Sequence, residues 1–219
     1  TLTMRLVRSF AEWPEPTDLT LILIHRSGSP SPIIREPDHL VIALPPLGES
    51  ERHALLKSLV PTQEFLPEIR ELVISRAAGN PLFLEEMTRL VREVIRNNAQ
   101  MNREAMANHI VEVIPVTLHE LIQSRIDRLD ARTRQVLQCA SLLGLEFSLS
   151  LIEMFDALRD GLAGHLHALL AMHYLERLPE PRDVRYLFTQ GLFRDVAYST
   201  LLEEQRRALH AALARRLEE

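Results

Sequence analysis

Cysteine and lysine are almost absent from this chain of 219 residues, which holds one of each. The single Cys139 excludes a disulfide within the chain, and its place in the apolar helical stretch 136–140 predicts a buried, inert thiol rather than a nucleophile. Lys57 lacks the flanking glycines of a phosphate-binding loop, in which backbone N–H groups and a lysine surround the anion. We therefore expect no catalytic residue and no hydrolysis of ATP by this chain alone.

Glycine, aromatic residues and long apolar runs are also scarce. Seven glycines and 5% aromatic residues argue against an all-β sandwich, which needs many turns and side chains that fill a pleated surface. No apolar run approaches the roughly 18–20 residues that cross a bilayer. The longest dense run, Leu19–Ile24, has the length of a strand. The chain begins with Thr1 and lacks the core of a signal peptide, so we expect a cytoplasmic piece of a longer polypeptide with no membrane partner.

Neither the charge nor the histidine spacing indicates a nucleic-acid or metal site. The formal charge of −5 gives no basic footprint for non-specific binding to nucleic acid. Among the nine histidines, His165 and His167 are two positions apart and point to different sides of a helix. No Cys, His and carboxylate cluster has ligand spacing, so we expect no metal.

Hydrophobic spacing divides the chain into three parts, at 1–47, 48–108 and 109–219. Two dense apolar runs, Leu19–His25 and Leu40–Leu44, predict buried parallel strands at the end of an α/β core. From residue 48 onward the period is helical, apart from the polar segment 97–108, for which we expect a linker or loop with a short helix at most. The predicted helices span 3–12, 50–60, 66–78, 81–99, 117–129, 131–143, 149–156, 161–173, 195–202 and 205–218.

Two alternating runs near the carboxyl end predict a β-hairpin. They are Tyr174–Leu178 and Val184–Phe188, joined by a five-residue turn that contains two prolines. Three short helices followed by a hairpin are the pattern of a winged-helix domain, a variant of the helix-turn-helix.

Charged residues of the helices are interpreted as surface features. Arg125, Asp127 and Arg128 could form exposed salt bridges, which usually contribute roughly 0–1 kcal/mol. Glu85 and Glu86 follow a predicted helix start, where the helix dipole favours carboxylates, and we prefer this interpretation to a catalytic dyad.

The stretch 78–86, Ala-Gly-Asn-Pro-Leu-Phe-Leu-Glu-Glu, is the most informative motif. Gly79 can end one helix, Asn80 can cap the next helix and Pro81 can open it, so the motif alone predicts a helix–helix junction. Together with the downstream blocks it resembles the nucleotide-binding region of STAND ATPases (signal-transduction ATPases with numerous domains). Those of large LuxR-type regulators and of bacterial adenylate cyclases with ATPase regions are the most similar. The downstream blocks span 114–129, 136–147 and 186–198.

The resemblance implies three nucleotide-binding residues. Arg26 matches the arginine that senses the terminal phosphate, and Pro81 matches the lid proline that packs beside the base. Gln190 stands where the family has a histidine near the diphosphate; glutamine can donate a neutral hydrogen bond but cannot become cationic at about pH 6–7. Without a nucleotide, the three would be a solvated cation at a strand end, a helix-starting proline and a surface amide.

The resemblance also implies a fold and a function. The expected fold is mainly α: a remnant of a parallel α/β ATPase core, a helical lid bundle, and a winged-helix domain with a small β-hairpin. The lid and winged helix would close over ADP and open when ATP replaces it, which would control a fused output domain such as an adenylate cyclase. The expected cofactor is ATP or ADP, with Mg²⁺ held by an amino-terminal part that this chain lacks. The expected partners are the other domains of the same polypeptide and further copies of it.

Two alternatives stay open. One is a DNA-binding winged helix, against which the candidate recognition segment 162–171 carries no Lys or Arg to meet bases and phosphates. The other is a helical interaction scaffold with no nucleotide, which the missing phosphate loop and Gln190 favour.

Overall fold

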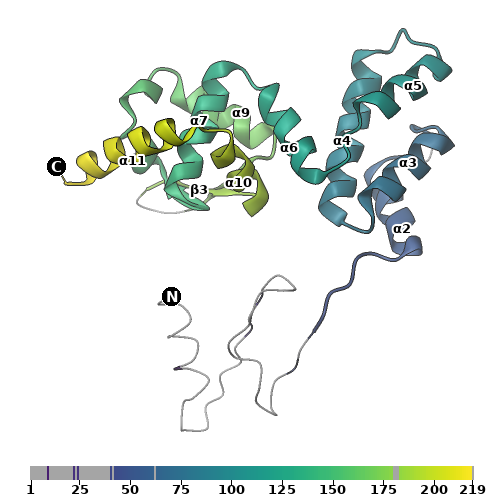
Figure 1. Cartoon of the computed structure of the whole chain (residues 1–219), viewed down its shortest axis with the longest axis horizontal. Coiled ribbons are helices and arrows are strands. Elements are labelled where there is room, and N and C mark those ends of the chain that lie inside the picture. The colour runs from purple at the N-terminus through teal and green to yellow at the C-terminus, as the bar shows by residue number, and fades with distance from the viewer. Residues whose placement is uncertain are drawn as a thin grey trace. The chain divides into compact units, whose positions relative to one another are not determined.

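The computed structural model describes residues 9, 22, 24, 40, 42–61, 63–179 and 183–218. The chain divides into two compact units, residues 1–46 and 47–219, and each is taken by itself. The described part is mainly helical with a small antiparallel sheet (Figure 1). The prediction of a mainly α fold is therefore confirmed.

The second unit begins with four helices around one apolar core. Their order and bounds are α2 (Glu49–Leu59), α3 (Pro67–Ala77), α4 (Pro81–Asn97) and α5 (Arg103–Val113). The core residues include Leu56, Val73, Met87, Val91 and Ile110, each at most 1% exposed. Helices α3 and α4 each contact the other three helices of this group.

Local sequence explains where these helices begin. The Glu51 carboxylate accepts the N–H of Gly48 at 2.7 Å, which fixes the start of α2. The Asn80 side chain accepts the N–H of Phe83 at 3.1 Å, and Pro81 follows at the first helical position of α4. Asn102 caps α5 in the same way, through the N–H of Ala105 at 2.8 Å.

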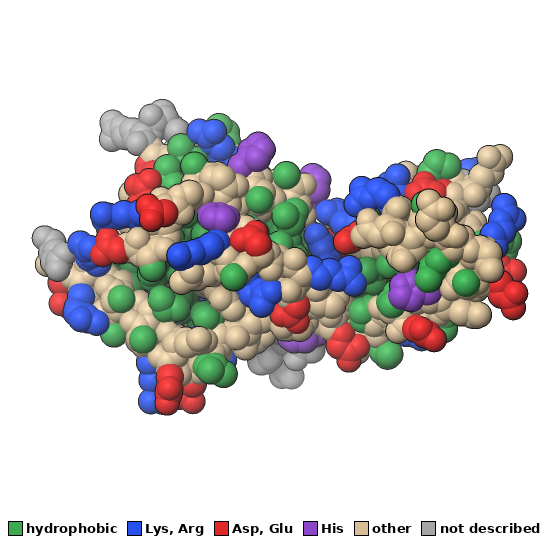
Figure 2. Space-filling view, turned by 90° about the horizontal axis from the view of Figure 1, so that it is seen from above, with side chains coloured by type: hydrophobic (Ala, Val, Ile, Leu, Met, Phe, Trp, Pro, Cys, Tyr) green, Lys and Arg blue, Asp and Glu red, His purple; other side chains and the backbone are tan. Residues whose placement is uncertain are grey.

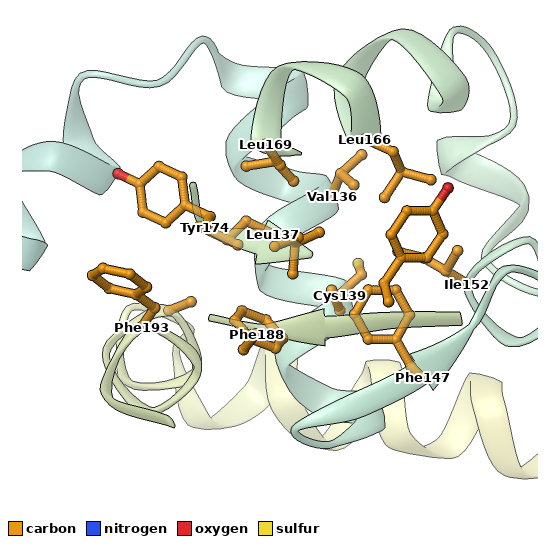
Figure 3. Packing of buried hydrophobic residues seen from close by; sticks show 14 of the residues in the cluster. Val136, Leu137, Cys139, Phe147, Ile152, Leu166, Leu169, Tyr174, Phe188 and Phe193 are labelled. Atoms are coloured by element: carbon orange, nitrogen blue, oxygen red, sulfur yellow. The ribbon is translucent and has the colours of Figure 1, made fainter. Parts of the chain in front are cut away.

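The remaining elements build a second apolar core. They are α6 (Leu118–Asp127), α7 (Ala131–Leu143), β1 (Glu146–Ser148), α8 (Leu149–Ile152), the 3₁₀ helix η1 (Asp156–Leu158), α9 (Leu162–Ala171), β2 (Leu175–Leu178), β3 (Arg185–Phe188), α10 (Gly191–Ser199) and α11 (Glu203–Glu218). In Figure 3, Leu166 and Leu169 of α9 point toward Val136 and Leu137 of α7. Helix α6 joins the two cores, because Leu121 belongs to the first and Ile122 to the second.

A three-stranded antiparallel sheet closes the second core. The strand order is β1-β3-β2, with Phe147 opposite Tyr186 and Leu175 opposite Phe188. The rings of Phe147 and Tyr186 stack with centroids 5.6 Å apart, a contact that adds to the area they bury. The predicted hairpin corresponds to β2 and β3. Strand β1 was not predicted, because three residues are too few to show an alternating pattern.

Two expectations for the middle of the chain are wrong. The described residues of 40–44 form no strand and are exposed, Leu40 to 86% and Leu44 to 89%. A buried parallel strand needs a paired neighbour, and the described residues before Glu146 contain no strand. The segment 97–108 is no linker either, since it includes the first half of α5.

The domain boundary expected after residue 108 therefore falls within α5. Met106 and Ile110 are buried in the same core as α3 and α4, because each turn of α5 directs an apolar side chain to that core. The change of core occurs later, inside α6. The α/β core expected over 1–47 lies almost wholly outside the described residues and stays a prediction. No helix in the described residues is long and apolar enough to cross a bilayer.

The turn between α3 and α4 generates a stability prediction. Ala78 has φ 48° and ψ 32°, in the left-handed region where an L residue is strained, and its side chain is exposed. Ala78→Gly should relieve this strain and raise the free energy of unfolding by about 0.5–1 kcal/mol, after the larger chain entropy of glycine is subtracted. Urea denaturation measures the change.

The matched control is Ala211→Gly, at an exposed position inside α11. There the backbone is helical, so glycine should lower stability, by up to about 1 kcal/mol. A destabilised Ala78→Gly variant would contradict the strain assigned to this turn.

Candidate functional site

The turn that carries Pro81 is held by backbone hydrogen bonds. Gly79, with φ 81°, accepts the N–H of Leu47 at 2.9 Å, and the N–H of Asn80 bonds to the carbonyl of Ala77 at 2.8 Å. These backbone hydrogen bonds end α3 and set the direction of α4. The Pro81 ring takes no part in them and is exposed. The exposed Pro81 ring at the start of α4 is thus accessible to a ligand.

Gln190 also lies at the start of a helix, because it is the residue just before α10. Its backbone is extended, with φ −140° and ψ 134°, and its carbonyl accepts the N–H of Phe193 at 3.0 Å. Its side chain makes no capping hydrogen bond to the helix and is exposed. The side-chain amide of Gln190 is therefore available to bind a ligand.

Two of the three predicted site residues, Pro81 and Gln190, lie within the described structure. Arg26 lies outside the described residues. Pro81 and Gln190 begin two different helices, and in the described part of the chain neither lines the two cavities considered below. Their nucleotide roles stay predictions.

A buried ion pair links helix α4, which Pro81 opens, to helix α6. Arg125 of α6 pairs with Glu86 of α4, and their side chains are only 11% and 4% exposed. The guanidinium carbon of Arg125 also lies 4.9 Å from the ring centroid of Tyr174 and 5.7 Å from that of Phe193, in α10. Burial lowers the pKa of Arg125 and raises the pKa of Tyr174, while the nearby Arg125 charge opposes the rise at Tyr174.

Backbone carbonyls complete the surroundings of this pair. Nη2 of Arg125 donates to the carbonyl of Met172 at 3.2 Å, and Nη1 of Arg89 donates to the same oxygen at 3.4 Å. Arg89 also approaches Glu86 at 4.0 Å. One cluster of charges therefore holds α4, α6, α10 and the turn after α9 in mutual contact.

Sequence reasoning missed this pair and gave its residues other roles. The Arg125 side chain is only 11% exposed and so is not a surface feature. Glu86 lies beyond the first turn of α4, so it does not act on the helix dipole. The available signal was the position of Glu86, three residues after Phe83 and four before Leu90, on the buried stripe of the helix. A carboxylate in that position requires a cationic partner.

The first cavity is a polar groove beside this pair, with a volume of about 970 Å³. Its lining comes from the middle of α4, the end of α6 and the turn into β2, and it includes five arginines. On the face shown in Figure 2, basic and acidic side chains are interspersed, with no extended field of either sign. The lining of the groove is mixed in the same way, because Glu64, Glu85, Glu93 and Asp130 stand beside the five arginines.

The second cavity, of about 650 Å³, lies beside α9 and includes Leu162, Leu166 and Tyr186 in its lining. The exposed positions of α9 are Ala163, Gly164, His167 and Ala171, so this helix presents no basic side chain. A helix that reads DNA normally supplies several basic or amide groups. The described structure thus adds no support for binding DNA.

Covalent and metal chemistry find no support either. Cys139 is 2% exposed, and burial raises its pKa to about 12, which keeps the thiol protonated and confirms that it is buried. Among the described residues, no group of three or more His, Cys, Asp or Glu side chains could hold a metal ion.

Comparison with known proteins gives one relative. No family model matches the chain, and no solved structure shows significant similarity to it. The chain is 25% identical over 177 residues to Uncharacterized protein R02095 of Rhizobium meliloti (strain 1021). The match covers 78% of this chain and 17% of that protein, so the chain spans about a sixth of the length of its relative.

The buried pair generates a double-mutant prediction. Arg125→Met leaves the Glu86 carboxylate buried without its main partner and should lower the free energy of unfolding by about 3–5 kcal/mol. Glu86→Met should have a cost of similar order. The double variant should lose much less than the sum of the two, because two apolar side chains of similar volume can pack where the charges were. Urea denaturation of all four proteins measures the coupling.

The exposed pair Arg207–Glu203 in α11 is the control, with side chains 78% and 72% exposed. Its coupling should stay within about 0.5 kcal/mol. Additive effects at Arg125 and Glu86 would show that the two charges act independently and would contradict the role assigned to the pair.

Proposed function

We propose that this chain is the lid and winged-helix part of a STAND-type nucleotide switch, which responds to an adenine nucleotide and controls a fused output domain. A switch of this kind needs two bodies that keep their own folds while the contact between them changes. A ligand can shift that equilibrium only by binding the two arrangements unequally.

The observation that carries the proposal is the division of the second unit into two apolar cores that share helix α6, with a buried charged pair where they meet. Each core has its own set of fully buried apolar residues, and the buried Arg125–Glu86 pair lies at their contact. When the contact opens, water can solvate both charges, and this offsets part of the cost of exposing the apolar side chains beside them. This arrangement suits a contact that can open and close.

Local features add support. The order helix, strand, two helices and hairpin, from α7 to β3, is the element order of a winged helix, and the hairpin is followed by Gln190. Both Pro81 and Gln190 are exposed at helix starts, where backbone N–H groups favour anions. A cytoplasmic location, expected from the amino-terminal sequence, stays part of the proposal.

The alternatives are weaker on present observations. A DNA-binding winged helix would need basic side chains on α9, which has none. A scaffold without a nucleotide role is compatible with the fold, but it gives no reason for a charged pair buried between two cores. A mobility-shift assay at low salt tests the first alternative, and nucleotide binding tests the second.

Substitution of Gln190 tests the proposed nucleotide site. Gln190→His should make the binding of fluorescently labelled ADP to the 219-residue chain depend on pH. A protonated imidazole donates a charge-assisted hydrogen bond to the diphosphate, so affinity should be about five-fold higher at about pH 6 than at about pH 8. The parent chain should show no such difference. Fluorescence anisotropy at both pH values measures the affinities.

His167→Gln, on the exposed side of α9, serves as the control and should leave ADP binding unchanged. No turnover of ATP is expected, because the chain lacks a phosphate loop. Absence of ADP binding by the parent chain and by Gln190→His, or equal binding by a Pro81→Ala, Gln190→Ala double variant, would refute the proposed nucleotide site.

A further inference from the structure

The floor of the polar groove contains a hydroxyl group that lacks a partner. Thr88 of α4 is 3% exposed, and in the described part of the chain its Oγ1 has no hydrogen-bond partner. Thr88 lines the groove together with Arg125 and Tyr174, both mostly buried. Buried hydroxyl groups are nearly always hydrogen-bonded in native proteins, so an unpaired one on a residue that lines a polar groove points to a ligand there.

The rim of the groove is rich in hydrogen-bond donors. Arg89, Arg92 and Arg96 follow one another at i, i+3 and i+7 on α4, so they share one face of the helix. Arg128, from the end of α6, also lines the groove. Each guanidinium carries five N–H donors in a fixed plane, and Arg96 has no hydrogen-bond or ion-pair partner among the described residues.

The carboxylates of the groove are mostly engaged by the protein itself. Glu64 accepts Nε of Arg92 at 2.7 Å, and Glu93 lies 3.7 Å from Nη1 of Arg128. Asp130 caps α7 by accepting the N–H of Thr133 at 2.9 Å. Glu85 is exposed at the edge. Because one bond uses only part of a guanidinium, the groove retains more free donors than free acceptors.

We propose that this groove binds the phosphate groups of a small polyanion, at a site separate from Pro81 and Gln190. Phosphate brings several acceptor oxygens and no donor, and its geometry matches the planar guanidinium fork better than a lysine would. Thr88 lines the groove, and a small rotation of its side chain would let the unpaired hydroxyl donate to a bound oxygen. Since both cores contribute to the lining, a bound polyanion would favour their closed contact.

Titration calorimetry with inorganic tripolyphosphate at low salt tests the site in the complete chain. The parent should show saturable one-to-one binding, weakened at least ten-fold by Thr88→Val and by Arg89→Gln. Thr88→Val keeps the shape of the side chain and removes an unpaired buried hydroxyl, so its melting temperature should not fall. A loss of binding in this variant is then a loss of the site rather than of the fold.

Arg207→Gln, in α11 and away from the groove, should bind tripolyphosphate like the parent. A second titration, with ATP, identifies the source of the phosphate. If ATP binds more tightly than tripolyphosphate, the natural ligand is a nucleotide. If ATP binds equally or more weakly, it is a free polyphosphate. Binding that is absent, that survives both Thr88→Val and Arg89→Gln, or that falls equally in Arg207→Gln would overturn the proposal. Binding lost in Thr88→Val but kept in Gln190→Ala separates this site from the proposed ADP site.

Discussion

A pair of opposite charges buried between two apolar cores is the constraint on which the second unit depends. Glu86 lies on the buried stripe of α4, and removing a carboxylate from water costs several kcal/mol unless a cation compensates. Arg125 supplies that cation, and the pair forms only when α6 lies against α4 beside Glu86. Because Arg125 also contacts Tyr174, Phe193 and the carbonyl of Met172, the sheet and α10 are brought to the same point.

Such a pair contributes more to specificity than to stability. Two hydrophobic side chains of similar volume could fill the same space with equal or greater stability, whereas one charge left alone is strongly unfavourable. The pair therefore selects one arrangement of the two cores and excludes arrangements that separate the charges within apolar surroundings. Water can solvate both charges once they separate, and this is the physical argument for the opening contact that we propose.

Sequence alone predicted the elements better than their contacts. The helices with strong periodicity and clear caps, such as α4 and α7, were predicted within a few residues, because caps and apolar spacing are local properties. The hairpin followed from alternation around a proline-rich turn. Strand β1 was missed since three residues carry no measurable period. Helix α5 was undervalued because polar residues dominate the segment 97–104 that leads into it.

The candidate site was less predictable, for a related reason. Pro81 and Gln190 were selected by resemblance to a family motif, and their exposure follows from their places at helix starts. The Arg125–Glu86 pair joins residues 39 positions apart, so no local pattern shows it. Only the incongruous carboxylate on an apolar stripe indicated that a distant partner was needed. The unpaired hydroxyl of Thr88 is likewise a property of packing, not of sequence.

The distance between the two cores is the most direct measure of this mechanism. Spin labels on Glu104→Cys in α5 and Glu204→Cys in α11 occupy exposed positions, and the buried Cys139 should not react. Pulsed electron resonance would compare the chain with and without Glu86→Gln. A broader or longer distance distribution in the variant, at unchanged far-ultraviolet circular dichroism, is the predicted result. An unchanged distribution, or a loss of helicity in place of a change in distance, would contradict a contact held by this charged pair.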